Sequence, residues 1–261
     1  MTRISHIPPR TRCVGLARAL SKLGYCSRSQ AVELIRDGRV RLNGKVRRDP
    51  ETPVTLQRDR IKVNGQPARA ARKTYWMMNK PRGAVTTASD ENGRKTVCDL
   101  LPKDLPWIAP IGRLDKASEG LLLFSNDSEW AARITLPETH LDKTYHVQIN
   151  QRVDAEELQR LTRGVRAENG EILQAKSATV LRHGEQNCWL EIVLDEGKNR
   201  QIRRMLEAMA IETLRLVRVA IGPLKLGELA KGASRSLSSQ EKHALDHTMR
   251  GRVHSRAFRA V

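Results

Sequence analysis

Two Asn-Gly pairs, Asn43-Gly44 and Asn64-Gly65, constrain the fold of the first part of the chain more than any other feature. Each pair directly follows a short strand-like run, Arg39–Leu42 or Ile61–Val63, in which basic and apolar residues alternate. Asn and Gly tolerate the positive φ angles of a tight two-residue turn, so this arrangement is a strong signal for a β-hairpin. The sequence therefore predicts short paired strands over residues 39–66.

Two short helices are expected before these strands. The leucines within residues 16–23 fall on one helical face, and Gly24 is suited to end that helix. Ser27, with Gln30 three residues later, has the pattern of a capping box for a second helix, which Asp37-Gly38 ends. Helix, helix and hairpin strands together predict a small α/β unit of about sixty residues.

The positive charge of the chain is concentrated in this same region. Residues 1–73 contain 18 Lys and Arg against 5 Asp and Glu, whereas residues 74–241 contain 24 against 23, and residues 242–261 contain 5 against 1. A basic module with ordered helix and hairpin patterns is typical of a nucleic-acid-binding surface, because each cation that neutralises a phosphate releases counterions. A solvated basic face or a membrane-surface patch is the less favoured alternative.

Other classes of protein fit the sequence poorly. No run approaches the ~18 apolar residues that span a bilayer, and the first residues lack the apolar core of a secretory signal, so we expect a cytoplasmic protein. The cysteines, Cys13, Cys26, Cys98 and Cys188, are scattered and suit neither a disulfide framework nor a zinc site. We therefore expect free thiols and no metal.

Residues 75–241 show a longer pattern of mixed strands and helices. Strands are expected at Tyr75–Asn79, Gly120–Ser125, Thr144–Ile149, Lys176–Leu181, Cys188–Leu194 and Leu214–Val219, and helices at Ser128–Leu136, Ala155–Arg163 and Arg200–Met209. This alternation predicts an α+β fold whose sheet is mixed and mainly antiparallel. Neither a dinucleotide-binding nor a Walker motif occurs, which gives no reason to expect a nucleotide cofactor.

Two side chains in this second region are candidates for chemistry. Asp115 lies in a loop between two strand-like runs, two residues after Arg113, where a turn residue, a structural ion pair and a catalytic carboxylate are all open. Tyr145 begins a strand in a chain with 3% aromatic residues, and it is either a core residue or a stacking platform for a base.

A third segment, Glu196–Met205, places cations at a helix start. Asn199 is expected to cap this helix, which gathers four cations around its first turn against the helix dipole: Lys198, Arg200, Arg203 and Arg204. Such a local conflict is expected where function requires it. A basic helix that touches phosphate and an Arg203 that points inward to a carboxylate both remain open.

Two resemblances bring these features together. Residues 14–65 resemble the S4-type RNA-binding domain, on the basis of Gly24, Ser27-Arg28, the Leu-Ile-Arg-x-Gly-x-Val run and Asn43-Gly44. From about Tyr75 to Glu241 the chain resembles the RsuA/RluB-type pseudouridine synthases. The matching segments, in family order, are MNKPRGAVTT (Met78–Thr87), GRLDKASEGLLLFSND, DKTYHVQI, EGKNRQIRRM and IGPLKLGEL.

The second resemblance implies specific roles. Asp115 matches the family's nucleophile, Tyr145 the aromatic residue that packs against the flipped uracil, and Arg203 the basic residue that pairs with the Asp and keeps it ionised. Ile202 would wall the pocket, and Arg113 would fill the gap that the extruded base leaves. Ser118, Ser125 and Lys116-Ala117 depart from the usual family residues, which puts the contacts just after Asp115 in doubt.

We therefore predict an S4-like RNA-binding domain at 13–66, a linker at 67–74, a catalytic domain at 75–241 and a flexible basic tail at 242–261. The predicted RNA contacts are Arg18, Lys22, Arg28, Arg36, Arg39, Arg41 and Arg200. The expected activity is the isomerisation of uridine to pseudouridine in ribosomal RNA by a monomer without a cofactor. A non-catalytic ribosome-assembly protein with a degenerate synthase domain is the alternative. A DNA-binding regulator with a helix-turn-helix at 16–37 fits the following strands poorly.

Overall fold

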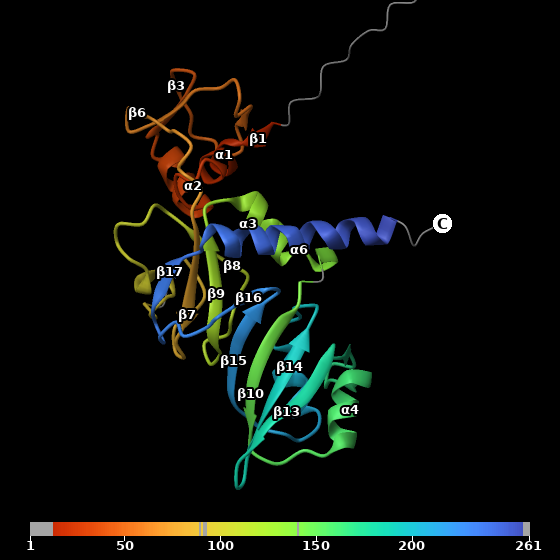
Figure 1. The fold of residues 1–261 in the computed structure, drawn as a ribbon. Helices are drawn as coiled ribbons and strands as arrows, with labels where there is room; N and C mark the ends of the chain where they lie inside the picture. The colour runs from red at the N-terminus through yellow and green to blue at the C-terminus, as the bar shows by residue number, and fades with distance from the viewer. Residues whose placement is uncertain (1–12, 89, 91–92, 140, 258–261) are drawn as a thin grey trace, which may run out of the picture. The chain divides into compact units, whose positions relative to one another are not determined.

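The computed structural model describes residues 13–88, 90, 93–139 and 141–257, and the chain divides into two compact units (Figure 1). The N-terminal unit runs to Lys73 and is joined by two short returning segments, Pro106–Ile108 and Asn126–Ser128. The second unit is the remainder of the chain from Thr74, and we name it the catalytic unit after the catalytic domain that the sequence resemblance implies there.

From residue 13 onward the N-terminal unit contains two helices and two small sheets. Helix α1 spans Leu16–Lys22 and α2 spans Arg28–Arg36. A four-stranded sheet has the order β3-β2-β5-β6, made of Lys45–Val46, Val40–Leu42, Ile61–Val63 and Gln66–Pro67. Strands β1 (Val14–Gly15) and β4 (Pro53–Val54) form a separate antiparallel pair that the sequence analysis did not predict.

The local signals in this unit are confirmed. Asn43 and Asn64 both have φ 51°, followed by Gly44 at 85° and Gly65 at 79°, so each pair closes a hairpin with two positive φ angles in succession. Ser27 accepts a hydrogen bond from the Gln30 amide, and the Gln30 side chain accepts one from the Ser27 amide, which completes the capping box. The apolar faces of both helices and of the hairpin strands share one core.

The catalytic unit is built on a nine-stranded mixed sheet. Its path is β13-β14-β10-β15-β9-β7-β17, with β16 paired to β15 and β8 paired to β9 (Figure 1). The strands are β7 Tyr75–Lys80, β8 Ala109–Ile111, β9 Glu119–Ser125, β10 Lys143–Ile149, β13 Ser177–His183, β14 Cys188–Leu194, β15 Thr213–Ile221, β16 Leu224–Lys225 and β17 Ser234–Ser236. All six predicted strands are present, and the α+β class is confirmed.

One parallel contact joins the two halves of this sheet. Strand β9 pairs with β15 only through Glu119 opposite Val217 and Gly120 opposite Arg218, while every other pair in the sheet is antiparallel. Gly120 has φ 101°, and a Cβ there would collide with the Arg218 carbonyl. A glycine is therefore needed where these two strands approach each other.

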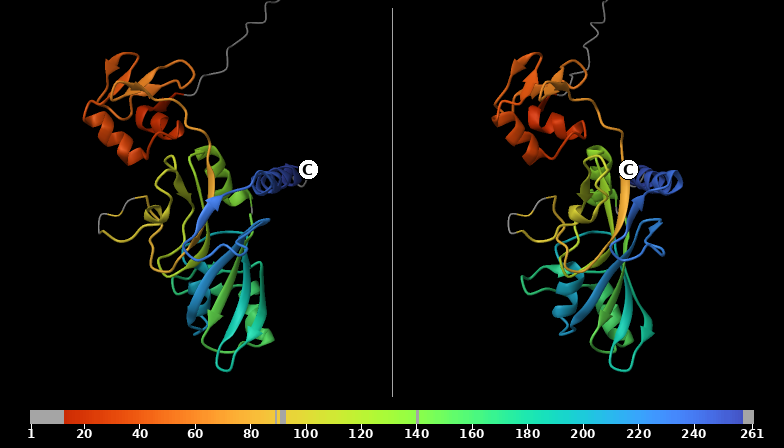
Figure 2. Two further views of the ribbon diagram at one scale, coloured as in Figure 1. Left: turned by 60° about the vertical axis from the view of Figure 1, so that its left-hand side comes forward. Right: turned by 90° about the vertical axis from the view of Figure 1, so that its left-hand side faces the viewer.

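Three helices of the catalytic unit match the predicted ones. They are α3 at Ser128–Thr135, α4 at Ala155–Arg163 and α5 at Gln201–Glu207. Figure 2 shows α4 and α5 on one face of the strands β13, β14, β10 and β15, where Val147, Leu190 and Ile192 are buried. A short hairpin, β11 (Val165–Arg166) and β12 (Ile172–Leu173), follows α4 and was not predicted.

The flexible tail predicted from residue 242 is wrong for the described residues. Helix α6 spans Ser239–Ala257, and Leu245 and Met249 on it are buried in the same core as Trp130 and Leu141. Trp130 also donates its indole N–H to Asp246 at 2.9 Å. The sequence of this segment is basic, but two apolar residues four positions apart lie on one face of the helix and pack into the core. Residues 258–261 of the predicted tail lie outside the described part.

Candidate active site

The loop that carries Asp115 connects β8 to β9. Gly112, at φ 69°, turns the chain out of β8, and the Ser118 amide donates to the Asp115 carbonyl oxygen at 3.0 Å just before β9 begins. The Asp115 side chain is 34% exposed, so the carboxylate is open to a ligand while its backbone is fixed. The sequence left a turn residue and a catalytic residue open, and the loop geometry accommodates both descriptions at once.

A buried lysine binds the backbone of this loop. Lys80, at the end of β7, has no exposed surface, and its Nζ donates to the carbonyl oxygens of Ser118, Asp115 and Pro81 at 2.8, 3.0 and 3.2 Å. The three donors of an ammonium group are thus matched by three acceptors, which is what allows a lysine to be buried. Burial lowers the pKa of Lys80 to about 8, and the nearby charges of Asp115 and Glu119 oppose this fall.

The same segment contacts the loop at two further points. Thr86 Oγ1 donates to the Leu114 carbonyl at 2.6 Å and accepts from the Leu114 amide at 3.3 Å. The Gly83 amide donates to the Lys116 carbonyl at 2.7 Å. Residues 80–86 therefore bind the backbone on both sides of Asp115, and we name Lys80, Gly83 and Thr86 the loop clamp.

These contacts show how the loop is held where its residues depart from those usual in the family. Lys116, Ala117 and Ser118 each contribute a backbone carbonyl oxygen, to Gly83, Arg203 and Lys80 respectively. Because no side chain of the three makes these bonds, the unusual side chains after Asp115 do not alter the way in which the loop is held. The sequence analysis assigned no role to the clamp. A lysine between a buried strand and a proline was the available signal.

A cleft of about 610 Å³ opens beside Asp115. Tyr145 from β10, Leu216 from β15 and Ile202 from α5 form an apolar wall, and each is at most 9% exposed. The cleft is also lined by the cations Arg113, Lys143, Lys198, Arg200, Arg203 and Arg218. Three predicted catalytic residues, Asp115, Tyr145 and Arg203, thus line one cleft, together with the predicted contacts Arg113, Arg200 and Ile202.

The ion pair predicted between Arg203 and Asp115 is not found among the contacts within 4 Å that described residues make. Within the described residues the cation within 4 Å of the carboxylate is Arg200, whose Nη1 lies 3.9 Å from Asp115 Oδ2. Arg203 instead donates to the carbonyl oxygen of Ala117 in the Asp115 loop at 3.3 Å and to that of Thr213 at the start of β15 at 3.5 Å. Burial and the charge of Arg200 lower the pKa of Arg203, and the charge of Asp115 opposes this.

The start of helix α5 also differs from the prediction. Arg200, rather than Asn199, is the N-cap residue, and it makes no side-chain cap. Its backbone is left-handed, with φ 49° and ψ 30°, a conformation that costs a non-glycine residue about 1–2 kcal/mol. Such a residue persists only where its surroundings hold it in place.

The predicted RNA contacts of the N-terminal unit lie on α1, α2 and β2 and the residues next to them. Arg18, Arg28, Arg36, Arg39 and Arg41 are exposed, and Lys22 is half-buried. Arg39 donates to the Asn64 side chain at 2.8 Å, and Arg41 donates to the Gly44 carbonyl at 3.3 Å, so both hairpin turns hold an arginine.

In the described part of the chain no group of three His, Cys, Asp or Glu side chains is arranged to hold a metal ion. The four cysteines are free, as predicted. None of the described helices combines the length and apolar character that a bilayer crossing requires.

Comparison with known proteins gives consistent matches over both units. The family described as RNA pseudouridylate synthase matches residues 74–208, and the S4 domain matches residues 14–59. The chain is 38% identical over 228 residues to a protein of Bacillus subtilis named ribosomal large subunit pseudouridine synthase B, covering 87% of this chain and 93% of the relative. It is also 38% identical over 230 residues to an uncharacterised RNA pseudouridine synthase of Aquifex aeolicus, covering 87% and 92%. A crystal structure of a pseudouridylate synthase, 27% identical, superposes with a TM-score of 0.63 over 89% of this chain and 99% of that one.

Proposed function

The chain belongs to the RNA pseudouridylate synthase family and carries an S4 domain, and from this premise we propose that it isomerises a uridine of ribosomal RNA with Asp115 as the nucleophile. The observation that carries the assignment of Asp115 is the loop clamp, which fixes the backbone of Asp115 while its carboxylate stays open to the cleft. Ribosomal RNA is the substrate class because the Bacillus relative is named for it.

The reaction needs no partner beyond the substrate. The bond between N1 of uracil and C1′ of ribose breaks, the ring turns, and C5 bonds to the same C1′. The hydrogen on C5 leaves as a proton and N1 takes one up, so atoms and electrons balance without an oxidant or a second substrate. We therefore propose that no cofactor takes part. Every side chain in this proposal comes from one chain, so a monomer suffices.

The walls of the cleft suit a base that has left its helix. A nucleoside fits within 610 Å³, a volume in the usual range for small-ligand sites. Tyr145 and Ile202 present apolar surface on which the uracil ring packs, and this contact offsets the few kcal/mol that unstacking costs. Exposed Arg113, on the same loop as Asp115, occupies the space that the flipped base leaves in the RNA.

The N-terminal unit supplies affinity in this proposal. Its exposed arginines reach phosphates, because double-stranded RNA offers its backbone more readily than its base edges. The buried Lys80 fixes the backbone of a loop whose acidic side chain stays open to the cleft, an arrangement that suits a reacting carboxylate. The loop clamp therefore favours the enzyme over a pure RNA-binding protein.

The test compares wild type with Asp115→Asn on unmodified ribosomal RNA transcripts. Asp104→Asn, the same change at an exposed site outside the cleft, is the matched control. Pseudouridine is mapped by chemical probing, and RNA binding is measured separately. We expect wild type and Asp104→Asn to make one new pseudouridine, and Asp115→Asn to bind RNA equally but make none.

Two results would contradict the proposal. If wild type binds the RNA but makes no pseudouridine, the catalytic assignment fails. If it modifies transfer RNA transcripts and leaves ribosomal RNA unchanged, the substrate class is wrong while Asp115 retains its role.

A further inference from the structure

The segment from Glu196 to Arg200 brings a cation to Asp115 without regular secondary structure of its own. It connects β14 to α5, and it ends at Arg200, whose left-handed backbone directs the side chain to within 3.9 Å of the Asp115 carboxylate. A left-handed arginine that is half exposed has no core to hold it. Something else must therefore fix this segment, which we name the cation loop.

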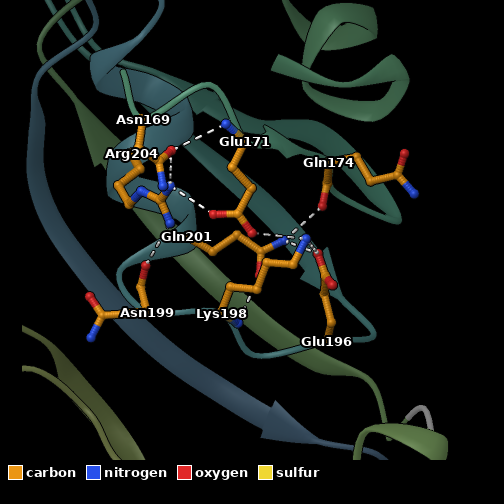
Figure 3. Close-up of polar contacts among 8 residues, drawn as sticks. All are labelled: Asn169, Glu171, Gln174, Glu196, Lys198, Asn199, Gln201 and Arg204. Atoms are coloured by element: carbon orange, nitrogen blue, oxygen red, sulfur yellow. Dashed lines mark hydrogen bonds and ion pairs between the residues drawn. The ribbon is translucent and has the colours of Figure 1, made fainter. Parts of the chain in front are cut away.

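The β11–β12 hairpin contacts the cation loop through one carboxylate (Figure 3). Glu171, in the hairpin turn, receives a 2.9 Å bond from Arg204 Nη2 on one oxygen and lies 3.3 Å from Lys198 Nζ with the other. Arg204 is the fourth residue after the left-handed Arg200, and Lys198 is the second before it. Glu171 therefore joins the two sides of Arg200.

Further bonds complete this contact on both sides. Arg204 also donates to the Asn169 side chain at 2.6 Å and to the Asn199 carbonyl at 3.5 Å. Gln201 donates to the carbonyl of Gln174 at 3.0 Å and to Glu196 at 2.7 Å. Figure 3 shows the side chains of Asn169, Glu171, Glu196, Gln201 and Arg204 turned toward one another, while Gln174 and Asn199 contribute backbone oxygens.

The hairpin turn is itself rigid. The Ala167 amide donates to the Glu171 carbonyl at 2.8 Å, and the Gly170 amide donates to the Ala167 carbonyl at 2.8 Å, with Gly170 at φ 81°. The Glu171 amide is bound to the Asn169 side chain at 3.3 Å. The carboxylate therefore projects from a fixed backbone, as a positioning group requires.

We propose that Glu171 is a positioning residue that holds the cation loop and so places Arg200 beside Asp115 for catalysis. The inference rests on the proposed function and extends it to a hairpin that lines no part of the cleft. The hydrogen bond from Arg204 lowers the pKa of the Glu171 carboxyl, which keeps it charged at neutral pH. A neutral amide at this position could not serve two cations at once, because one of its two polar atoms is a donor.

The experiment measures single-turnover pseudouridine formation and RNA affinity for Glu171→Gln. Glu168→Gln makes the same chemical change three residues away in the same turn, where the side chain is exposed, and is the matched control. Arg200→Gln and the double variant Glu171→Gln/Arg200→Gln complete a cycle. Thermal unfolding is recorded for all variants. Because about a third of the Glu171 side chain is exposed, we expect Glu171→Gln to fold.

We expect Glu171→Gln to slow single-turnover pseudouridine formation at saturating RNA about five- to tenfold. RNA affinity should not change, because the residue acts only on the reacting complex. Glu168→Gln should match wild type. The double variant should be no slower than Arg200→Gln alone, because Glu171 acts through Arg200.

Three results would overturn the inference while leaving the proposed function intact. One is a wild-type rate in Glu171→Gln alongside an inactive Asp115→Asn. Another is a loss of RNA affinity with an unchanged rate, which would make Glu171 part of an RNA contact. The third is a double variant whose loss is the product of the two single losses. If wild type itself makes no pseudouridine, the proposed function fails, and this inference fails with it.

Discussion

The N-terminal unit and the catalytic unit both carry many cations, but they use them in opposite ways. In the N-terminal unit Arg18, Arg28, Arg36, Arg39 and Arg41 are exposed, and none of the five forms an ion pair with a carboxylate of the described residues. Their charge remains available to a polyanion. Since each phosphate contact adds a similar increment, affinity in such a unit is shared among many replaceable side chains.

In the catalytic unit several of the cations are instead paired with carboxylates that set their positions. Arg215 and Lys231 both bind the buried Glu119, Arg235 binds Glu241, and Arg204 binds Glu171. Here a charge acts through its position, and its neighbours cannot replace it. The comparison predicts that single substitutions in the catalytic unit change rate or stability, while only combined substitutions in the N-terminal unit change affinity strongly.

Among the substitutions that test this comparison, the largest effect is expected from Lys80→Met, which removes the ammonium group and keeps the chain length. The carbonyl oxygens of Asp115, Ser118 and Pro81 lose their donor. Each buried acceptor left unsatisfied costs about 1–3 kcal/mol, so a rate loss of about 100-fold is reasonable once the loop shifts. Single-turnover rate and RNA affinity, measured together, should show the loss in the rate alone.

The pH profile provides an internal control for this prediction. Because burial lowers the pKa of Lys80 to about 8, the folded enzyme loses one of three donors as the pH rises through 8. Activity should then fall, while the contribution of Lys80 to stability rises between pH 8 and 10.5, where the unfolded chain still binds the proton. A wild-type rate that stays flat from pH 7 to 9 would contradict the role of Lys80 in holding the loop.

A smaller effect, in affinity alone, is expected from the triple variant Arg28→Gln, Arg36→Gln, Arg39→Gln. Three lost phosphate contacts should weaken RNA binding about tenfold at moderate salt and reduce the slope of log affinity against log salt by about 2 to 3. The rate at saturating RNA should not change.

The matched control replaces three exposed cations of the catalytic unit, Lys103, Arg160 and Arg163, by Gln. We expect this control to bind RNA with nearly the wild-type dependence of affinity on salt. Equal losses of affinity in the two triple variants would mean that RNA binding depends only on the net charge of the chain, and the role assigned to the N-terminal unit would be wrong.

Prediction from sequence succeeded where the signal was local. Asn43-Gly44 and Asn64-Gly65 set their hairpins through their own backbone preferences, and Ser27 with Gln30 caps α2 through contacts three residues apart. The site is different in kind. Lys80 reaches carbonyls 35 and 38 residues away, and no local periodicity encodes such contacts.

Two expectations differ from the structure because contacts with distant parts of the chain decide the outcome. Arg203 was expected within ion-pair distance of Asp115, but the left-handed backbone at Arg200, which the sequence did not predict, brings Arg200 to 3.9 Å from that carboxylate. The basic composition of residues 242–261 suggested a flexible tail, although Leu245 and Met249 dock the helix in a core made by distant strands. Composition describes the surface of that helix and says little about its two anchors.

The smallest effect is expected at the start of that helix, from Glu241→Gln. Glu241 receives two bonds from Arg235, at 2.7 and 2.8 Å, and its carboxylate and amide form a capping box with Ser238. The bond from Arg235 lowers the pKa of Glu241 to about 2. Loss of the charge should reduce the free energy of unfolding by about 1 kcal/mol, or a few degrees in Tm, with no change in RNA affinity.

The pH dependence of stability distinguishes the Arg235–Glu241 pair from a general effect of surface charge. A folded pKa below the usual 4.5 means that the stabilisation is complete above pH 4.5 and is lost as the pH falls toward 2. The difference in urea midpoint between wild type and Glu241→Gln should therefore be constant from pH 7 to 5 and shrink by pH 3. Exposed Glu228→Gln should show no difference at any pH. An altered RNA affinity in Glu241→Gln would place Arg235 among the RNA contacts. It would then contradict the division between exposed cations that bind RNA and cations that carboxylates hold in fixed positions.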